Sequence, residues 1–418
     1  MATGEATLAR ARDGRFQTFR ALRHRNFRLY WFGMLVAIIG WQVQMVAQGW
    51  LVYELTGSTA LLGAVGLTQA IPTIVLTLAG GVVADRVDRR RLLIITQGSV
   101  GLLLALLAAL VLSRTVQLWH IFAIAFAVGG VWAFDQPARQ ALVPHLVERE
   151  DLMNAIAMVS MVWQSSRIIG PAIAGPMIAW LGVGPCFLVT TIGMLGMITS
   201  LRTLQVTPIV PTGRHNALAD LRDGLGYVIR TPIFSMLIGL TFFNSLFGMS
   251  YVQMMPVFAK DVLAVGSRGL GLLLAVGGAG ALIGTTILAT LGIIRRKGLI
   301  VLGGSAVFGV LLIGFALSRS YALSLALLFV IGAVNSVYMT TVNTSLQALV
   351  PDELRGRVMG IFTLTWSFLP LGGFLAGAVA GQFAHPATGA SLAIAAGGVA
   401  VILAALAAAL SARQIRGL

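Results

Sequence analysis

Four charged side chains in this sequence of 418 residues stand within long apolar runs or at their ends. Arg167 lies deep within one run, Asp135 stands near the end of another with Arg139 shortly after it, and Glu54 closes a third. A charge at the centre of a bilayer costs at least ~2.5–3.5 kcal/mol, so such a group must face protein or water. A carboxyl group at that depth can carry a proton, and an arginine there can bind an anionic group or respond to proton movement.

Each of these residues leaves two interpretations open. Asp135 is the first candidate for a proton-carrying group, but a simple pair with Arg139, one helical turn away, explains it equally well. Arg167 either lines a cavity or pairs with a buried acid. Glu54 is either an external proton site or an ordinary residue at a helix end.

The composition indicates the kind of protein in which these charges stand. Hydrophobic residues make up 57% of the chain and charged residues only 10%, whereas ordinary soluble domains have about 25% charged residues. The net charge of +15 would suggest nucleic acid in a soluble protein, but here the basic residues cluster at the ends of apolar runs. They therefore indicate membrane topology and contact with anionic lipid, and no nucleic-acid partner is expected.

Twelve apolar runs follow one another along the chain, each long enough to cross a bilayer, which takes ~20 residues. They begin near residues 28, 60, 92, 118, 153, 181, 234, 269, 299, 321, 358 and 390. A polypeptide in lipid must satisfy its own backbone hydrogen bonds, and the sequence lacks the ~10-residue alternating strands of a closed barrel. We therefore predict an all-α membrane protein with twelve transmembrane helices in two pseudo-symmetric six-helix bundles.

The distribution of lysine and arginine predicts the orientation in the membrane. Segments assigned to the inner side hold 24 of these residues and those assigned to the outer side hold 4, which leaves Arg167 within a run. Because basic segments resist translocation, both termini of this multi-pass protein are expected in the cytoplasm. Residues 1–27 interleave arginine with phenylalanine and leucine, which predicts a basic amphipathic stretch at the inner face.

A long interruption and an internal repeat divide the chain into two halves. Residues 203–232 separate the sixth run from the seventh, and 217–230 repeat apolar residues on one helical face. The peptide QALVP occurs at 140–144 and again at 347–351, each time between the fourth and fifth runs of its half. The predicted units are a basic N-terminus at 1–27, six-helix bundles at 28–202 and 233–412, a central cytoplasmic linker at 203–232, and a cytoplasmic tail at 413–418.

A short charged turn joins the second run to the third. On its charges alone it is a topology signal, because a cluster of arginines resists transfer across the membrane. Its spacing resembles the signature loop of the major facilitator superfamily, although Asp88 stands where that family usually has glycine. The resemblance implies two bundles that open alternately to either side, and a turn that helps to hold the outward-open form. The residues expected to form this conformational lock are Gly81, Asp85, Arg86, Arg89 and Arg90.

The fifth run carries a second element that resembles the same superfamily. Gly170, Pro171 and Gly175 match the glycine- and proline-rich element of the fifth helix in its exporters, with Ala174 in place of one glycine. Such residues thin and bend a helix, so that it can pack closely and pivot. An ordinary packing face of small residues remains the alternative, because the matching run of the second half is also rich in glycine.

Further segments resemble one branch of that superfamily. Residues 19–32, 50–58 and 137–146 are similar to the branch that contains the enterobactin exporter and macrolide-efflux proteins. The resemblance implies a secondary transporter of the bacterial inner (plasma) membrane. It would export amphiphilic small molecules of drug, macrolide or siderophore type by proton antiport. An importer or uniporter of a small organic solute remains one alternative, and a transport-inactive sensor or assembly factor is another.

The resemblance also implies that the first, fourth, seventh and tenth helices line a central cavity. Neutral polar and aromatic residues of these runs and the fifth are therefore expected to face a substrate. A large aromatic site with amide groups and few charges suits a bulky amphiphile better than a sugar phosphate. Hydrogen bonds between helices are the alternative explanation for many of these residues. The cavity candidates are Trp41, Gln42, Gln44, Gln48, Trp132, Trp163, Asn244, Tyr251, Gln253, Asn335, Tyr338 and Asn343.

Other functional classes find no support in the sequence. It has no GxxxxGK[ST] loop for an ATPase, and its five histidines are scattered. Cys186 is the single cysteine, so the chain can form neither an internal disulfide nor a cysteine-based metal site. We therefore expect no enzyme activity, no cofactor and no metal. The expected state is a monomer whose partners are a small amphiphilic substrate, protons and membrane lipid.

Overall fold

The computed structural model describes residues 14–205, 217–291 and 297–411, with side chains except at 14–18, 78, 85, 217–223, 291 and 411. Within these ranges the chain forms helices joined by short connections, without strands. Eleven of the described helical segments are long and apolar enough to cross a membrane. The predicted all-α membrane fold is therefore confirmed. The predicted tail at 413–418, residues 1–13 of the N-terminal stretch and part of the linker lie outside the described residues.

The first six spans are continuous helices. A 3-10 segment, η1 (Gly14–Arg23), precedes them, and the short turns η2 (Val143–His145) and η3 (Arg149–Asp151) connect the fourth span to the fifth. The spans are α2 (Arg25–Thr56), α3 (Thr59–Arg86), α4 (Arg89–Leu112), α5 (Leu118–Leu142), α6 (Leu152–Leu181) and α7 (Gly184–Thr203).

Two spans of the second half are interrupted. The seventh consists of α9 (Pro232–Phe243), the π-helix η4 (Asn244–Gly248), α10 (Tyr251–Val257) and the π-helix η5 (Phe258–Val262). The eleventh consists of α14 (Asp352–Leu364), the 3-10 segment η6 (Thr365–Phe368) and α15 (Leu369–Ala380). The others are α11 (Gly266–Leu291), α12 (Lys297–Leu317), α13 (Tyr321–Leu349) and α16 (Pro386–Ser411). The helix α8 (Ala217–Arg230) coincides with the amphipathic segment of the linker. Single π-helical turns occur frequently at functional sites.

Local sequence sets the boundaries around the second span. Gly57 ends α2 with a φ of 61°, a conformation that glycine adopts without steric cost. The Ser58 hydroxyl then caps α3 by accepting a hydrogen bond from the Leu61 N–H at 3.3 Å. The Asp88 carboxylate caps α4 by accepting from the Arg90 N–H at 2.9 Å. The aspartate that departs from the usual family glycine thus serves as a helix N-cap.

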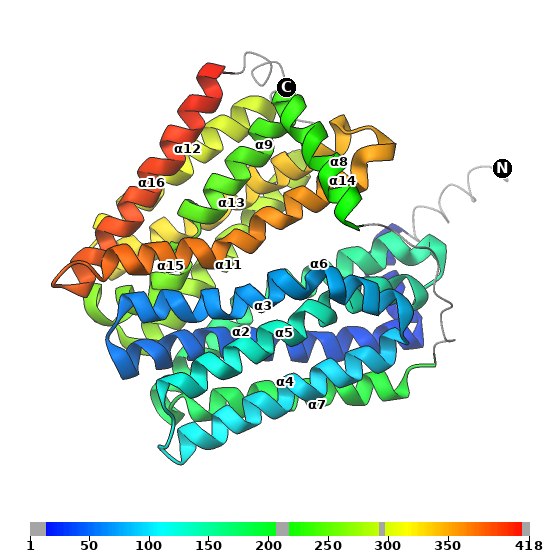
Figure 1. Ribbon diagram of the computed structural model, residues 1–418, viewed down its shortest axis with the longest axis horizontal. Coiled ribbons are helices and arrows are strands. Elements are labelled where there is room, and N and C mark those ends of the chain that lie inside the picture. Colours follow the sequence, from blue (N-terminus) through cyan, green and yellow to red (C-terminus); the bar gives the residue numbers. More distant parts are fainter. Residues whose placement is uncertain (1–13, 206–216, 292–296, 412–418) are drawn as a thin grey trace.

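The two halves pack their helices in equivalent ways (Figure 1). In the first half α3 packs on α5 and α4 on α7, and in the second half their counterparts α11 and α12 pack on α13 and α16. The halves meet where α6 packs against α11 and α15 against α3, two contacts related by the same duplication. From there the halves diverge toward the side where α8 and α14 lie. We call this side the basic end, because the charged turn between α3 and α4 also lies there.

Candidate functional site

Small residues hold the two halves together at the end opposite the basic end. A Cβ added at Gly175 of α6 would lie 2.7 Å from the Ser267 carbonyl oxygen and 2.9 Å from the Gly271 Cα of α11. A Cβ added at Gly63 of α3 would lie 2.6 Å from the Gly373 carbonyl oxygen of α15. Backbones approach this closely only where no side chain intervenes. These two crossings form the closed end of the molecule.

The glycine and proline element of α6 makes contacts on both sides of that helix. The Pro171 carbonyl oxygen would lie 2.5 Å from a Cβ added at Gly271, so it faces α11. A Cβ added at Gly170 would meet the Gln42 side chain of α2. The element therefore packs α6 against its own half and against the other half at the same level. A helix in that position must move relative to α11 whenever the closed end opens.

Polar contacts between the halves reinforce the closed end. The Tyr53 hydroxyl of α2 donates a hydrogen bond to the Asp261 carboxylate in η5, and the Lys260 ammonium lies 5.4 Å from the centre of the Tyr53 ring. The Arg268 guanidinium lies 4.7 Å from the centre of the Trp180 ring, a cation–π contact between α11 and α6. The sequence analysis missed these pairs because their partners lie in different halves, and no local pattern marks them.

Arg167 stands where the closed contact ends and an exposed face of α6 begins. Its carbonyl oxygen would lie 3.0 Å from a Cβ added at Gly278 of α11, whereas its side chain is exposed. Ala157 and Ser160 share the helical face of Arg167 toward the basic end and are exposed as well. Pro171, on the same face in the other direction, packs against α11. One face of α6 is thus closed at one end and open at the other, as the wall of a chamber between the halves would be.

Arg167 forms no ion pair with any carboxylate whose side chain the structure describes. This finding favours the cavity-lining interpretation over a structural pair with a buried acid. The arginine and its polar neighbours also distinguish α6 from the other spans. Although α6 has 30 residues, it is not among the eleven segments that are apolar enough to cross a membrane by composition. A helix with one face toward a polar chamber does not need to be apolar all round.

Three tryptophans form an aromatic cluster near Arg167. The Trp41 ring centre of α2 lies 5.0 Å from that of Trp132 on α5 and 5.8 Å from that of Trp163 on α6. All three side chains are partly exposed, and Trp163 lies one helical turn from Arg167. The Trp41 Nε1 is buried without a hydrogen-bond partner. The structure therefore brings together three of the predicted cavity residues and leaves one indole donor unused.

The glutamines predicted on α2 divide into two groups. Gln42 is partly exposed and packs against α6. Gln44 and Gln48 are buried, and the Gln44 amide donates a hydrogen bond to the Gln48 side-chain oxygen at 2.5 Å. These two residues thus bond to each other within packed protein, and the Gln44 side-chain oxygen is left without a partner. Glu54, the proton candidate at the end of the same helix, is exposed.

Two candidates of the seventh span lie at the contact between the halves. Tyr251 of α10 is buried and lies within electrostatic range of Arg167 of the other half. The Gln253 amide donates a hydrogen bond to the Leu62 carbonyl oxygen at 3.2 Å. Gln253 therefore belongs to the closed end, and Tyr251 belongs to the surroundings of Arg167.

The remaining four candidates lie on the seventh and tenth spans. Asn244 and Tyr338 are fully buried, and both polar side-chain atoms of Asn244 lack a hydrogen-bond partner. Asn335 and Asn343 of α13 are partly exposed, and Asn343 accepts a hydrogen bond from Gln347 at 2.6 Å. Of these four, Asn335 and Asn343 are therefore the two with partly exposed surfaces, although the Asn335 side-chain oxygen is buried without a partner.

Asp135 lies inside the first half, with only 2% of its surface exposed. Its Oδ1 accepts hydrogen bonds from the Thr96 hydroxyl at 2.7 Å and from the Gln97 amide at 2.6 Å. Its Oδ2 pairs with the Arg139 guanidinium. Each carboxylate oxygen therefore has a donor, as a buried charge requires. The pair with Arg139, which the sequence left as an alternative, is present.

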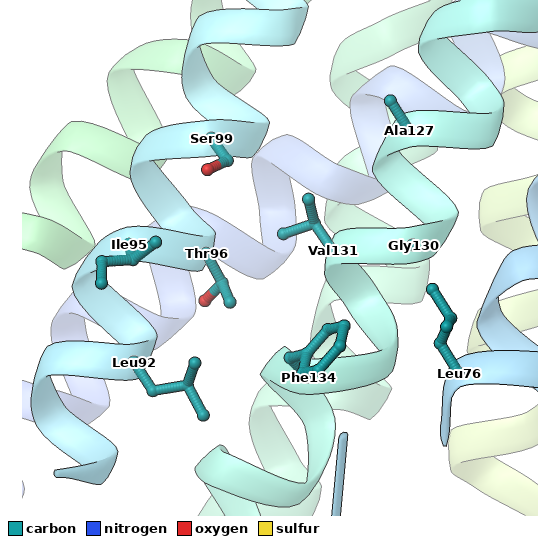
Figure 2. A pocket seen from close by; sticks show the side chains of 9 residues that line it. All are labelled: Leu76, Leu92, Ile95, Thr96, Ser99, Ala127, Gly130, Val131 and Phe134. Carbon is teal, nitrogen blue, oxygen red and sulfur yellow. The ribbon is translucent and has the colours of Figure 1, made fainter. Parts of the chain in front are cut away.

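A groove lies next to this network, between α3, α4 and α5. Figure 2 shows the Thr96 and Ser99 hydroxyls among apolar side chains such as Leu92 and Phe134. Thr96 thus lines the groove and also donates a hydrogen bond to Asp135. Because the lining residues come from these three helices, the groove is separate from the face of α6 that carries Arg167.

Two arginines of the charged turn bind the ends of neighbouring helices. The Arg89 guanidinium donates a hydrogen bond to the Ala141 carbonyl oxygen of α5 at 3.0 Å. The Arg90 guanidinium donates to the carbonyl oxygens of Leu201 and Arg202 in α7, at 2.6 and 2.5 Å. Cations are favoured at helix C-termini, where carbonyl groups lack intrahelical partners. These contacts connect α4 to α5 and α7 within the first half.

The other predicted members of the lock are placed differently. Arg86 is exposed, and a Cβ added at Gly81 would meet nothing within 4 Å. The close approach at this level is made by Gly80 instead, whose added Cβ would meet the Ala133 carbonyl oxygen of α5. Asp85 belongs to α3, but its side chain lies outside the described residues.

An ion-pair cluster that the sequence analysis missed anchors the N-terminal segment. The buried Asp151 carboxylate lies 2.7 Å from the Arg20 Nε, 2.8 Å from the His24 Nε2 and 3.6 Å from the Arg23 Nη2. The hydrogen bond with His24, together with the charges of Arg20 and Arg23, holds the pKa of Asp151 below its ordinary value. The cluster joins η1 to η3 at the basic end. The only sequence signal for this cluster was that the N-terminal segment is basic and that the connection before α6 contains acidic residues.

The paired six-span halves, the glycine crossings and the isolated arginine on an exposed interior face define a membrane transporter of the major facilitator type. A family model described as transmembrane secretion effector matches residues 16–416. The chain therefore belongs to the transmembrane secretion effector family of the major facilitator superfamily. The prediction of a transporter rather than an enzyme is confirmed.

Relatives of known name include two siderophore proteins. The staphyloferrin A transporter of Staphylococcus aureus is 26% identical over 362 residues, which cover 83% of this chain and 88% of the relative. The enterobactin exporter of Shigella boydii is 27% identical over 343 residues, which cover 81% of each chain.

Solved structures of the same fold include a bacterial homologue of the human lysosomal transporter Spinster in an inward-facing, unoccupied conformation. It has a TM-score of 0.75 at 15% identity, over 93% of this chain and 96% of that one. A nucleoside transporter has a TM-score of 0.70 at 14% identity, over 92% and 98%. At these identities the likeness shows the fold alone.

Proposed function

We propose that this transporter exports amphiphilic small molecules of siderophore type by alternating access, driven by proton entry. The observation that carries the proposal is one face of α6. On the C-terminal side of Arg167 this face packs against α11, and on the N-terminal side it is exposed. The enterobactin exporter and the staphyloferrin A transporter support the substrate class by their names.

We propose that the basic end faces the cytoplasm, because the excess of lysine and arginine in its segments resists translocation. The described form is then open inward, with its outer end closed by the two glycine crossings. In the opposite form the halves would close at the basic end, around the turn that Arg89 and Arg90 fix to α5 and α7. Asp85 remains our candidate for the residue that stabilises that closure.

For the proton we propose Asp135. The α5 helix carries both Asp135 and, one turn away, Trp132 of the aromatic cluster. Protonation of the carboxyl group would release Arg139 and weaken the hydrogen bonds from Thr96 and Gln97. A change at one turn of α5 would then reach the chamber through the next turn of the same rigid helix.

The test uses the full chain in proteoliposomes loaded with iron-free enterobactin or staphyloferrin A. An imposed pH gradient is expected to drive flux of at least one compound against the proton flow, and a protonophore is expected to abolish it. Flux that is unaffected by the gradient would identify a uniporter, and flux in the same direction as the protons would identify an importer. If neither compound moves under either gradient, the proposed function is refuted.

A further inference from the structure

We infer that Arg167 makes the chamber selective for anionic amphiphiles. In this arrangement the guanidinium binds a carboxylate or a similar acidic group, and the tryptophan cluster of Trp41, Trp132 and Trp163 holds the aromatic part of the same molecule. The inference rests on the proposed function, because it assigns the substrate class of the same chamber.

Arg167 has no counter-charge among the described side chains. Arg167 sits in the middle of a spanning helix and pairs with no carboxylate whose side chain the structure describes. In the open form, water in the chamber can solvate the guanidinium. Alternating access requires a form closed at both ends, in which most of that water has left. A lone charge in such a site is unfavourable, whereas a bound anion would neutralise it.

The surroundings of Arg167 fit an aromatic acid. Trp163 lies one turn along α6, and its ring contacts Trp41, which in turn contacts Trp132. Indole rings bind aromatic groups by stacking and edge contacts. A guanidinium binds a carboxylate with two parallel hydrogen bonds, which fixes orientation as well as charge. The buried Nε1 of Trp41 is a further donor without a partner in this cluster.

The second half contributes Tyr251, a buried residue of α10 within electrostatic range of Arg167. An anion between these two residues would touch α6 of one half and α10 of the other. It would therefore stabilise forms in which the halves are close, and a neutral analogue would do so less. The same contact would give the protein a means to distinguish loaded from empty transporter.

Two fluorescent probes test the inference, dansyl-phenylalanine and its neutral amide, dansyl-phenylalaninamide. Binding is measured by energy transfer from protein tryptophan to dansyl, with the full chain in detergent. We expect the unchanged protein to bind the carboxylate about tenfold or more tightly than the amide, as for a hydrogen bond to a charged group. Arg167→Gln should remove this preference, and Arg167→Lys should restore part of it. The control Arg114→Gln, in the connection between α4 and α5, should retain it.

Equal affinity of the unchanged protein for the two probes, or binding of neither, would overturn the inference. A preference that survives in Arg167→Gln would overturn it as well. Thermal unfolding of each variant in detergent identifies a folding defect. If Arg167→Gln does not fold, Arg167→Lys tests the inference, because it keeps the positive charge and should keep part of the preference for the carboxylate. These outcomes are distinct from failure of the proposed function, which is the absence of siderophore flux in proteoliposomes of the unchanged protein.

Discussion

Replacement of Gly175 by alanine is expected to weaken the closed end. The new Cβ would lie 2.7 Å from the Ser267 carbonyl oxygen and 2.9 Å from the Gly271 Cα. Both atoms belong to the backbone of α11, so no side-chain rotation can relieve the contact. The two helices must separate by several tenths of an ångström, or the halves must adopt a form in which this crossing is open.

The size of the effect follows from known costs of overpacking. An extra methyl group in a tight contact costs about 1–3 kcal/mol. Since 1.4 kcal/mol corresponds to a tenfold change in an equilibrium constant, the ratio of open to closed forms at this end should rise by about 5- to 150-fold. The neighbouring crossing of α3 with α15 is unchanged, so it should keep part of the population closed.

Double electron–electron resonance in nanodiscs measures this shift. Spin labels at Leu112 of α4 and Leu317 of α12 report across the closed end, because both side chains are exposed there and belong to different halves. Cys186 is buried and should not take up label. The control is Gly303→Ala on α12, where an added Cβ would meet nothing within 4 Å. If Gly175→Ala and the control give the same distance distribution, the glycine crossing does not govern closure.

Two further predictions concern the first half. Asp135→Asn should destabilise the protein by about 3–5 kcal/mol, because it leaves the buried Arg139 without a counter-charge. The double variant Asp135→Asn/Arg139→Gln should recover much of this loss in thermal unfolding, and an equal loss in both would contradict a structural pair. Asp151→Asn should lower the melting temperature at neutral pH, and the difference should shrink on acidification. The pKa of Asp151 is held below its ordinary value of 3.8 in the folded state, so its stabilisation is present above that value and is lost as the pH falls through the folded-state pKa. A difference that stays constant from neutral pH to about pH 3 would contradict this assignment.

Much of the architecture was readable in the sequence, because the bilayer imposes simple constraints. An apolar run of spanning length must become a helix, and short charged connections leave few ways to order the spans. The twelve predicted runs correspond to twelve helical spans in the part of the chain that the structure describes, and both QALVP copies lie where α5 and α13 end. The charged turn and the glycine and proline element also indicated the superfamily, because their residues are close together in the chain.

The site was less predictable, because its contacts join residues that are far apart in the chain. Composition could not separate Gln42, which packs against α6, from Gln44 and Gln48, which bond to each other in packed protein. Nor could it show that Gly80, rather than Gly81, makes the close approach to α5. Such distinctions depend on helix rotation, which a span that is apolar on most of its surface encodes weakly.

The sequence by itself determined that this chain crosses a membrane as helices in two related halves, because hydropathy and charge act along the chain. Only the tertiary structure decided which polar side chains pair with each other. It gave Asp135 to Arg139 and Asp261 to Tyr53, and it left Arg167 on an exposed face without a described carboxylate. The physical reason is that charge pairing depends on distances of a few ångströms, which helix packing sets.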